Sequence, residues 1–179
     1  VNSLSGQVDV EGDFIIDQDF SFANATVTME PSAEIIVQGG RNLDVDHSNL
    51  SACSNMWKGI KVEADASTRV IFSNLADAQY AINLQDGSTA WITNNTFERN
   101  FVGIYAPQSP VDFNNINLYV AENTFKSGSG LVGAYTGQYP SPSSKAFAGI
   151  QLHDMVLDLS NPGMQPNIFQ DMSNGVVGS

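Results

Sequence analysis

The amino-acid sequence predicts an all-β protein, a right-handed parallel β-helix whose coils are about 22 residues long. Two observations predict this fold class, an unusual composition and an internal repeat. Of the 179 residues, 51 are Asn, Ser or Gly, which interrupt helices and favour turns. Ten Phe and many Val and Ile side chains are sufficient for the core of one domain, so the chain is not expected to be disordered.

The repeat appears first as a small residue followed by an aliphatic one. Gly59-Ile60, Ala81-Ile82 and Gly103-Ile104 follow one another at a constant interval. The interval to Gly149-Ile150 is slightly longer than two periods, so it fits either two periods or one period with an insertion. Gly175-Val176 then follows after a little more than one period. A repeat of this length is typical of solenoid proteins.

A second pattern recurs in step with the first. Its members share Asn-x-Phe and are Asn95-Thr96-Phe97, Asn123-Thr124-Phe125 and Asn167-Ile168-Phe169. Phe97 precedes Gly103 by six residues, and Phe169 precedes Gly175 by six. Two independent patterns with a common offset indicate a true repeat.

Short runs of alternating apolar and polar residues fill each period, as expected of strands with one buried face. In chain order the clearest runs are 8–10, 14–16, 20–22, 25–29, 33–37, 42–45, 60–62, 70–72, 82–84 and 91–93. Turn formers such as Gln38-Gly39-Gly40 and Asp86-Gly87-Ser88 separate them. No run is long enough for a helical crossover, so the remaining geometry is a stack of coils joined by turns. Residues 1–24 are expected to form an opening coil or an N-terminal cap.

Equivalent residues of successive coils lie above one another in such a stack. This predicts an inward aliphatic ladder of Ile60, Ile82 and Ile104 and an aromatic ladder of Phe97, Phe125 and Phe169. Asn residues at the turns are expected to adopt left-handed backbone angles and to hydrogen-bond their counterparts in neighbouring coils.

Several elements together resemble a known family. The elements that carry the resemblance are the run 31–37, Leu43, Ser48-x-Leu50 and Met56-Trp57-Lys58-Gly59-Ile60. Residues 25–177 resemble secreted right-handed parallel β-helix repeat proteins of the Bacteroidota type. The resemblance implies the pectate-lyase-like superfold and a secreted or cell-surface location, and by itself it implies no activity. Such proteins are usually long, so residues 1–179 are expected to be a single β-helix segment of a longer chain.

The charge balance limits the partners. Nineteen acidic residues against seven basic ones give a formal net charge of −12, which disfavours nucleic acid and anionic lipid. No apolar run approaches the length that a membrane span requires, so no membrane insertion is expected. The single cysteine, Cys53, excludes an intrachain disulfide and is expected to be a small buried residue.

Catalytic residues are not evident. A polysaccharide lyase needs a basic residue as proton acceptor, and only Lys58 and Lys61 lie close together, where an odd separation would place them on opposite faces of a strand. His47 and His153 each neighbour an acid, and a solvent-facing or turn position is the preferred interpretation for both. The chain is therefore expected not to be an enzyme.

Calcium is the one cofactor that the sequence suggests. Asp9 alternates with Glu11, and Asp44 alternates with Asp46, so each pair would share one strand face and offer hard oxygen ligands. Neither run matches an EF-hand loop or a glycine-rich calcium repeat. A solvated acidic face is the alternative.

One segment, residues 133–146, interrupts the repeat and is expected to be a loop insertion rich in Tyr, Pro and Ser. Tyr135 and Tyr139 within it are candidates to stack on sugar rings or to anchor a protein partner. The alternative is a loop that packs on its own coil. A second, shorter loop is expected near residues 107–117.

These observations predict a non-enzymatic, secreted or cell-surface module with a structural or adhesion role. Its expected partners are other protein subunits or cell-surface glycans. A homo-oligomer or filament is also expected, because a coil that ends at Val176-Val177 would leave the backbone groups at the end of the stack unpaired. The alternative function is a polysaccharide-binding module, or a polysaccharide lyase or hydrolase of the same superfold.

Overall fold

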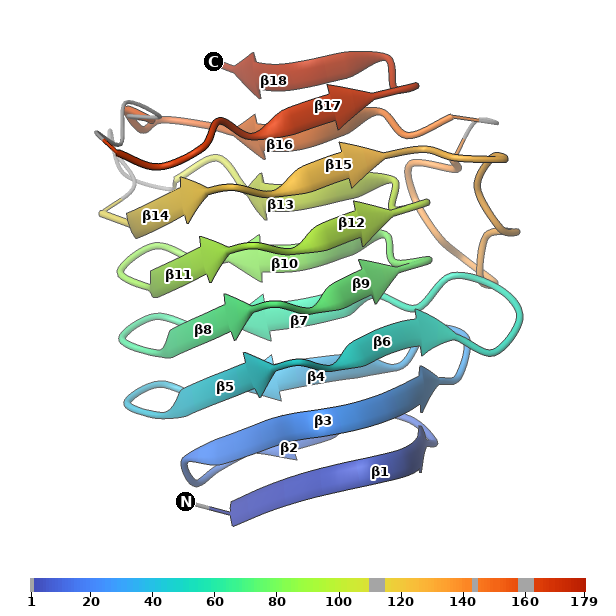
Figure 1. Cartoon of the computed structure of the whole chain (residues 1–179), viewed down its shortest axis with the longest axis vertical. Coiled ribbons are helices and arrows are strands. Elements are labelled where there is room, and N and C mark those ends of the chain that lie inside the picture. Colours follow the sequence, from blue (N-terminus) through green and yellow to red (C-terminus); the bar gives the residue numbers. More distant parts are fainter. Residues whose placement is uncertain (1, 110–114, 143–144, 158–162) are drawn as a thin grey trace.

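The computed structural model describes residues 2–109, 115–142, 145–157 and 163–179. The protein is an all-β parallel solenoid of about seven turns that lie roughly 23 residues apart, as the sequence predicts. The coils stack along one axis, with the N-terminus at one end and the C-terminus at the other (Figure 1). Residues 110–114 and 143–144, which belong to the two expected loops, lie outside the described residues.

Each regular coil contributes three short strands joined by bends. The first leg consists of β1 (Asn2–Val10), β3 (Phe20–Met29), β5 (Asn42–Asp46), β8 (Ser67–Ile71), β11 (Thr89–Thr93) and β14 (Asn117–Ala121). The second leg consists of β6 (Asn49–Ala52), β9 (Asn74–Ala76), β12 (Thr96–Glu98), β15 (Thr124–Lys126) and β17 (Ile168–Gln170). The long strand β3 pairs with both β5 and β6, so the two legs form one continuous sheet.

The third side of the solenoid is a separate parallel sheet. Its strands are β2 (Phe14–Ile16), β4 (Glu34–Val37), β7 (Gly59–Val62), β10 (Tyr80–Leu84), β13 (Val102–Ala106), β16 (Ala148–Leu152) and β18 (Asn174–Gly178). Because β13 pairs directly with β16, the long interval between Gly103 and Gly149 is one period with an insertion and not two periods. Residues 2–16 form β1 and β2, which pair with β3 and β4 as the first coil of the stack.

The length of a coil varies with its connections. Asn42 pairs with Ser67 and Ser67 pairs with Thr89, so the first of these two coils is three residues longer than the second. The longer coil contains the connection from Cys53 to Lys58, between β6 and β7, where the next coil needs only three residues. The constant period of the sequence therefore belongs to the middle coils, and insertions between strands lengthen the others.

The aliphatic ladder forms as predicted. Ile60, Ile82 and Ile104 are register partners in β7, β10 and β13, and all three are fully buried. Ile35 and Ile150 extend the ladder by one coil in each direction. Alternation on a parallel strand places these side chains in the core, where a stacked aliphatic column fills the space between the sheets.

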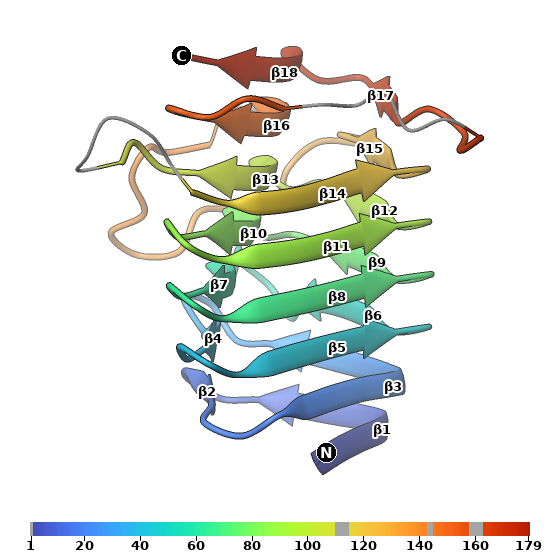
Figure 2. The ribbon, with the colours of Figure 1, turned by 90° about the vertical axis from the view of Figure 1, so that its left-hand side faces the viewer.

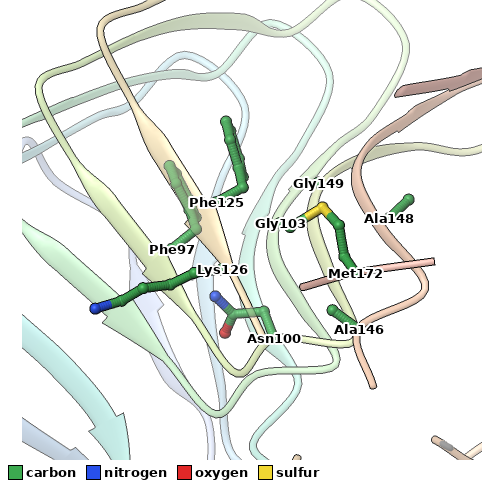
Figure 3. Close-up of a pocket in the computed structure, with 9 residues that line it drawn as sticks. All are labelled: Phe97, Asn100, Gly103, Phe125, Lys126, Ala146, Ala148, Gly149 and Met172. Atoms are coloured by element: carbon green, nitrogen blue, oxygen red, sulfur yellow. The ribbon is translucent and has the colours of Figure 1, made fainter. Parts of the chain in front are cut away.

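The aromatic ladder also forms, and the glycine column explains its spacing. The rings of Phe97 and Phe125 stack at 4.6 Å and those of Phe125 and Phe169 at 5.1 Å. A Cβ atom on Gly103 would lie 2.6 Å from Cδ1 of Phe125, so any side chain there would collide with the ring. Figure 3 shows the rings of Phe97 and Phe125 together with Gly103 and Gly149. The Gly and Phe patterns recur together because the rings of Phe125 and Phe169 occupy the space that a side chain on Gly103 or Gly149 would need.

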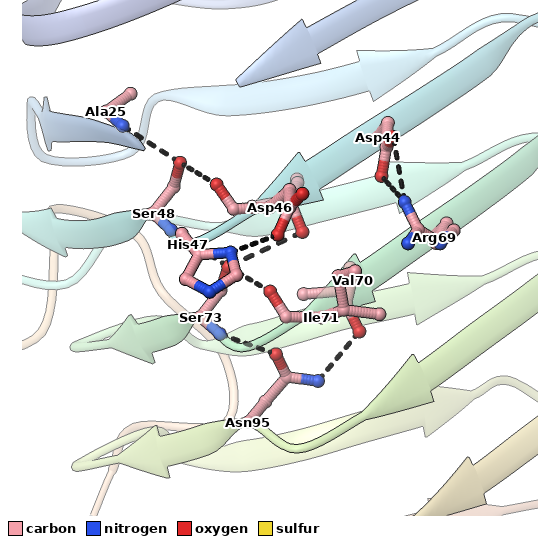
Figure 4. Close-up of polar contacts among 11 residues, drawn as sticks. Ala25, Asp44, Asp46, His47, Ser48, Arg69, Val70, Ile71, Ser73 and Asn95 are labelled. Atoms are coloured by element: carbon pink, nitrogen blue, oxygen red, sulfur yellow. Dashed lines mark hydrogen bonds and ion pairs between the residues drawn. The ribbon is translucent and has the colours of Figure 1, made fainter. Parts of the chain in front are cut away.

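A column of polar side chains runs through the bends between the two legs. Side-chain oxygens of Ser48, Ser73, Asn95, Asn123 and Asn167 each accept the backbone N–H of the equivalent residue in the preceding coil, at 2.9–3.0 Å. Figure 4 shows the N-terminal part of this column, from Ala25 to Asn95. The expected side-chain hydrogen bonds between coils are thus present, although Ser replaces Asn in the early coils. The amides of Asn95 and Asn123 are buried, so these bonds satisfy polar groups that water does not reach.

Left-handed backbone angles occur one residue earlier than the buried amides. The residues at this bend are Asn24, His47, Phe72, Asn94 and Glu122, with φ between 47° and 60°. Only two of the five are Asn, so position in the coil and not residue type selects this conformation. The prediction that Asn would adopt these angles holds for Asn24 and Asn94, whereas Asn95 and Asn123 supply the hydrogen bonds.

Candidate functional site

A pocket of about 530 Å³ lies on the outer face of the sheet that contains β10 and β13. This volume lies in the range of small-molecule and sugar sites. Five of its seven lining residues are aromatic, and the set is Tyr80, Phe101, Tyr105, Tyr139, Pro140, Phe147 and Gln151. None of the seven carries a formal charge at neutral pH.

Two tyrosines that point away from the core form the floor of the pocket. Tyr80 opens β10 and Tyr105 lies in β13, and their rings stack at 4.3 Å with planes 17° apart. They are not register partners, because Tyr80 pairs with Val102 and Tyr105 with Asn83. Burial raises the pKa of both hydroxyls, and the neighbouring Tyr105 raises the pKa of Tyr80 further. Both side chains are therefore neutral hydrogen-bond donors at physiological pH.

The loop that precedes β16 forms the wall. It runs down the side of the solenoid from the level of β15 to that of the middle coils (Figure 1). Gln79 holds it, since its Nε2 donates to the carbonyl oxygen of Tyr139 at 2.8 Å and its Oε1 accepts the hydroxyl of Tyr135. The backbone N–H of Met56 adds a bond of 2.8 Å to the carbonyl oxygen of Gly133. Gln79 is buried, so the loop is fixed to the core and not to a surface side chain.

The loop places the two predicted tyrosines differently. Tyr139 lines the pocket and is 87% exposed, so its ring is free to contact a ligand. Tyr135 is half-buried and packs against the apolar cluster around Met56 and Phe101. Burial, and then the charge of Glu34, raises the pKa of Tyr135. Tyr135 therefore packs on the protein itself, whereas recognition of a ligand by Tyr139 stays a prediction.

Four aromatic residues of the pocket were not among the predicted site residues. They are Tyr80, Phe101, Tyr105 and Phe147, and each follows or precedes a small-plus-aliphatic element of the repeat by one or two residues. In the sequence, each of the four is an aromatic residue near the small residue of the repeat, which is Ala81, Gly103 or Gly149. That pattern could have been found by aligning the repeats on this small residue.

The polar groups below the pocket include Glu34, Lys58 and Lys61. Burial raises the pKa of the Glu34 carboxyl, and the charges of Lys58 and Lys61 partly offset this effect. The side chains of Lys58 and Lys61 are each about one-third exposed, so both point away from the core and the expectation that they face opposite sides is wrong. The reason is that Lys58 precedes β7, and Gly59 at φ 118° breaks the alternation between them.

The acids predicted as calcium ligands lie apart. Asp9 and Glu11 are at the end of β1 in the first coil, whereas Asp44 and Asp46 belong to β5. The Asp44 carboxylate accepts two hydrogen bonds from Nη1 of Arg69, at 2.9 and 3.0 Å, and Asp46 contacts the imidazole of His47 (Figure 4). Within the described residues no three His, Cys, Asp or Glu side chains gather as a metal site would require. Calcium binding stays a prediction.

Other acids of the N-terminal run have a structural role. Oδ1 of Asp13 accepts the backbone N–H of Glu34 at 3.1 Å, and Oδ1 of Asp19 accepts that of Asn42 at 3.0 Å. Each therefore ties its own coil to the next one.

Three further expectations concern single residues and membrane spans. Cys53 is exposed and not buried, because it follows β6 in the connection to β7 and does not lie on an inward strand position. His47 is exposed at a bend, as expected, and His153 is partly buried at the bend that follows β16. The described part of the chain contains no α-helix that could span a membrane.

A second, much smaller cavity lies beside the phenylalanine ladder. It has about 10 Å³ and is lined in part by Phe125, Lys126 and Met172 (Figure 3). Such a volume holds about one water molecule, so this cavity is a packing gap and not a ligand site.

Comparison with known proteins found no matching family profile, no similar curated protein and no similar solved structure.

Proposed function

We propose that the protein is a non-enzymatic, secreted or cell-surface adhesion module that binds a saccharide in the tyrosine-lined pocket. The observation that carries this proposal is the combination of five aromatic side chains with neutral hydroxyl and amide groups in a pocket of about 530 Å³. A sugar ring has an apolar face that packs on aromatic rings and hydroxyl groups that need hydrogen-bond partners. The pocket offers both.

The chemistry of the lining favours binding over catalysis. General acid–base catalysis needs a group that exchanges a proton near neutral pH. Among the seven lining residues the only titratable side chains are the three tyrosines, and burial raises the pKa of Tyr80 and Tyr105 away from neutrality. These hydroxyls can donate hydrogen bonds to a sugar but are poor proton acceptors.

The scaffold supports an adhesion role. The pocket combines side chains of the rigid sheet with Tyr139 and Pro140 from a loop that Gln79 holds in place. Recognition sites are commonly built from loops on a rigid scaffold, and a preordered site loses little entropy when it binds.

A glycan array tests the proposal directly. The wild-type protein is expected to bind a defined class of saccharide, and Tyr105→Ala and Tyr139→Ala are each expected to lower the affinity about tenfold or more, since each removes a stacking ring. Ile168→Ala is the control, because Ile168 is an exposed apolar residue of β17 on another side of the solenoid.

Two results would contradict the proposal. Binding that survives both pocket variants would place the saccharide elsewhere. Release of unsaturated or reducing ends from pectin or alginate would show that the protein is an enzyme, which is the alternative function.

A further inference from the structure

The outer face of the first leg carries a row of aromatic and charged side chains that the saccharide pocket does not use. Asp44, Arg69, Trp91 and Tyr119 are successive register partners in β5, β8, β11 and β14, and we call them the 44–119 row. Trp91 is 48% exposed although it lies in an interior strand of this sheet. Figure 2 shows the four strands one above another on the side of the solenoid that faces the viewer.

The 44–119 row is ordered before any partner arrives. Two hydrogen bonds from Nη1 hold Arg69 on the Asp44 carboxylate at 2.9 and 3.0 Å (Figure 4). The rings of Trp91 and Tyr119 stack at 3.8 Å with planes 16° apart. Ordered side chains lose little entropy on association, and Trp, Tyr and Arg are the residues enriched at the centres of protein interfaces.

We propose that this face binds a second copy of the same chain, related by a two-fold axis that runs parallel to the strands. Such an axis makes the two solenoids run in opposite directions, so the 44–119 row of one copy faces the same row of the other copy in reverse order. Asp44 then faces the partner's Tyr119, and Arg69 faces the partner's Trp91. A carboxylate accepts a hydrogen bond from a tyrosine hydroxyl, and a guanidinium group packs favourably on an indole.

The neighbouring column at the bend is complementary in the same arrangement. It consists of His47, Phe72, Asn94 and Glu122, which directly follow β5, β8, β11 and β14. Reversal places His47 opposite the partner's Glu122 and the exposed ring of Phe72 opposite the partner's Asn94. Both columns rise by the same strand spacing of about 4.8 Å, so all these pairs come into register together. None of these pairs opposes like charges.

The opposite orientation fails the same comparison. A two-fold axis parallel to the solenoid would set Asp44 on the partner's Asp44 and Arg69 on the partner's Arg69. Like charges directly opposed across an interface are unfavourable. The order of residues in the 44–119 row therefore selects the antiparallel dimer.

The size of the face sets the expected affinity. Four strands at about 4.8 Å and roughly six residues at about 3.3 Å give a face of about 400 Å² per copy. Stable interfaces bury about 800 Å² per partner, so the dimer is expected to be weak and to depend on concentration. Each chain carries a net charge of −12, so the measurement belongs at physiological salt, where long-range repulsion is screened.

Sedimentation equilibrium from micromolar to millimolar protein measures the association. The wild-type protein is expected to shift from monomer to dimer, and Arg69→Glu and Trp91→Thr are each expected to weaken the dimer roughly tenfold or more. Lys126→Glu is the matched control, since it reverses one charge and breaks one surface ion pair, with Glu98, on the second leg. Circular dichroism confirms that each variant is folded. A wild-type protein that stays monomeric, or variants that dimerise unchanged, would overturn the proposal.

Cross-linking with a bifunctional thiol reagent that spans about 10 Å, the usual separation of sheets packed face to face, tests the orientation in a Cys53→Ser background. Ser67 and Thr89 lie two residues before Arg69 and Trp91 on the same strands, and the antiparallel dimer brings Ser67 opposite the partner's Thr89. A mixture of Ser67→Cys chains and Thr89→Cys chains is therefore expected to give the mixed cross-linked dimer. Cross-linking of Ser67→Cys chains to themselves in preference to the mixed dimer would show that the antiparallel arrangement is wrong.

Discussion

Glycine at the second residue of β13 and of β16 has a steric role that can be measured by one substitution. A Cβ atom on Gly103 would lie 2.5 Å from the carbonyl oxygen of Gly149 and 2.6 Å from Cδ1 of Phe125. A Cβ on Gly149 would lie 2.5 Å from Cδ1 of Phe169. The close approach of backbone and ring, and not backbone conformation, is what requires glycine at both positions.

We expect Gly103→Ala to lower the free energy of unfolding by about 1–3 kcal/mol, because the added methyl group overpacks the phenylalanine ladder. Chemical denaturation measures this change. Gly178→Ala is the control, since a Cβ there meets nothing within 4 Å, and it is expected to be close to neutral. Equal effects of the two substitutions would contradict the steric explanation.

The buried amide of Asn123 links its own coil to the preceding coil at a single residue. Its Oδ1 accepts the N–H of Asn95 at 3.0 Å, and its Nδ2 donates to the carbonyl oxygens of Ile92 and Ala121 at 2.9 and 2.8 Å. Removing the amide would leave these three backbone groups without this partner in a region that water does not reach.

Asn123→Leu is therefore expected to lower the free energy of unfolding by about 2–4 kcal/mol, the cost of burying unsatisfied polar groups. The exposed Asn49 of β6 provides the same substitution at the surface, and Asn49→Leu is expected to change stability by less than about 0.5 kcal/mol. Thermal and chemical unfolding of both variants test the difference.

At the scale of elements, the strands were predictable and the loop contacts were not. Each coil needs Ile in the core and a small residue beside Phe, so this requirement recurs along the chain as a visible pattern. The contact between Gln79 and Tyr139 spans 60 residues and occurs once, so no repeat reveals it. The stack of Tyr80 on Tyr105 is diagonal across two strands, and the two residues are separated by more than one period of the middle coils.

The loop should be released by one substitution in the strand region that holds it. Gln79→Leu removes both side-chain bonds to the loop, so we expect faster hydrogen exchange at the amides of Met56 and Gln138, which bond to or within it. Gln151→Leu is the control, because Gln151 lines the pocket without holding the loop. Unchanged exchange in Gln79→Leu would show that apolar packing alone fixes the loop.

At the scale of the whole molecule, three half-buried tyrosines on one side predict the response to alkali. Burial raises the pKa of Tyr80, Tyr105 and Tyr135 above the usual value of about 10. In this pH range the unfolded chain loses these protons first, so deprotonation favours unfolding. The associated stability is fully present below about pH 10 and is lost as the pH rises through the folded-state values.

Melting temperatures measured between neutral pH and about pH 11 should therefore fall in the alkaline range, where the absorbance of tyrosinate rises. The double variant Tyr80→Phe and Tyr105→Phe is expected to show a smaller alkaline decline, because phenylalanine has no proton to lose. A decline of the same size in both proteins would assign the effect to other groups.

The solenoid fold could be predicted from the sequence because every coil repeats the same pattern of buried residues and turns. The surface features could not, since surface residues need not recur from coil to coil. The interval between neighbouring members of the 44–119 row changes at every step, so no constant spacing identifies them as one row. The strand register, which depends on every connection length, was needed to align them.

The hydrogen-bonded column through the bends also has a direction. In each of the five bonds that a backbone N–H donates, the N–H belongs to the earlier coil and the side-chain oxygen to the later one, from Ala25 with Ser48 through Asn123 with Asn167. The backbone N–H at the bend of one coil therefore gains this hydrogen-bond acceptor only when the following coil has formed. A chain synthesised from its N-terminus would gain order one coil at a time, because each new coil supplies the side-chain oxygens to which the coil before it donates.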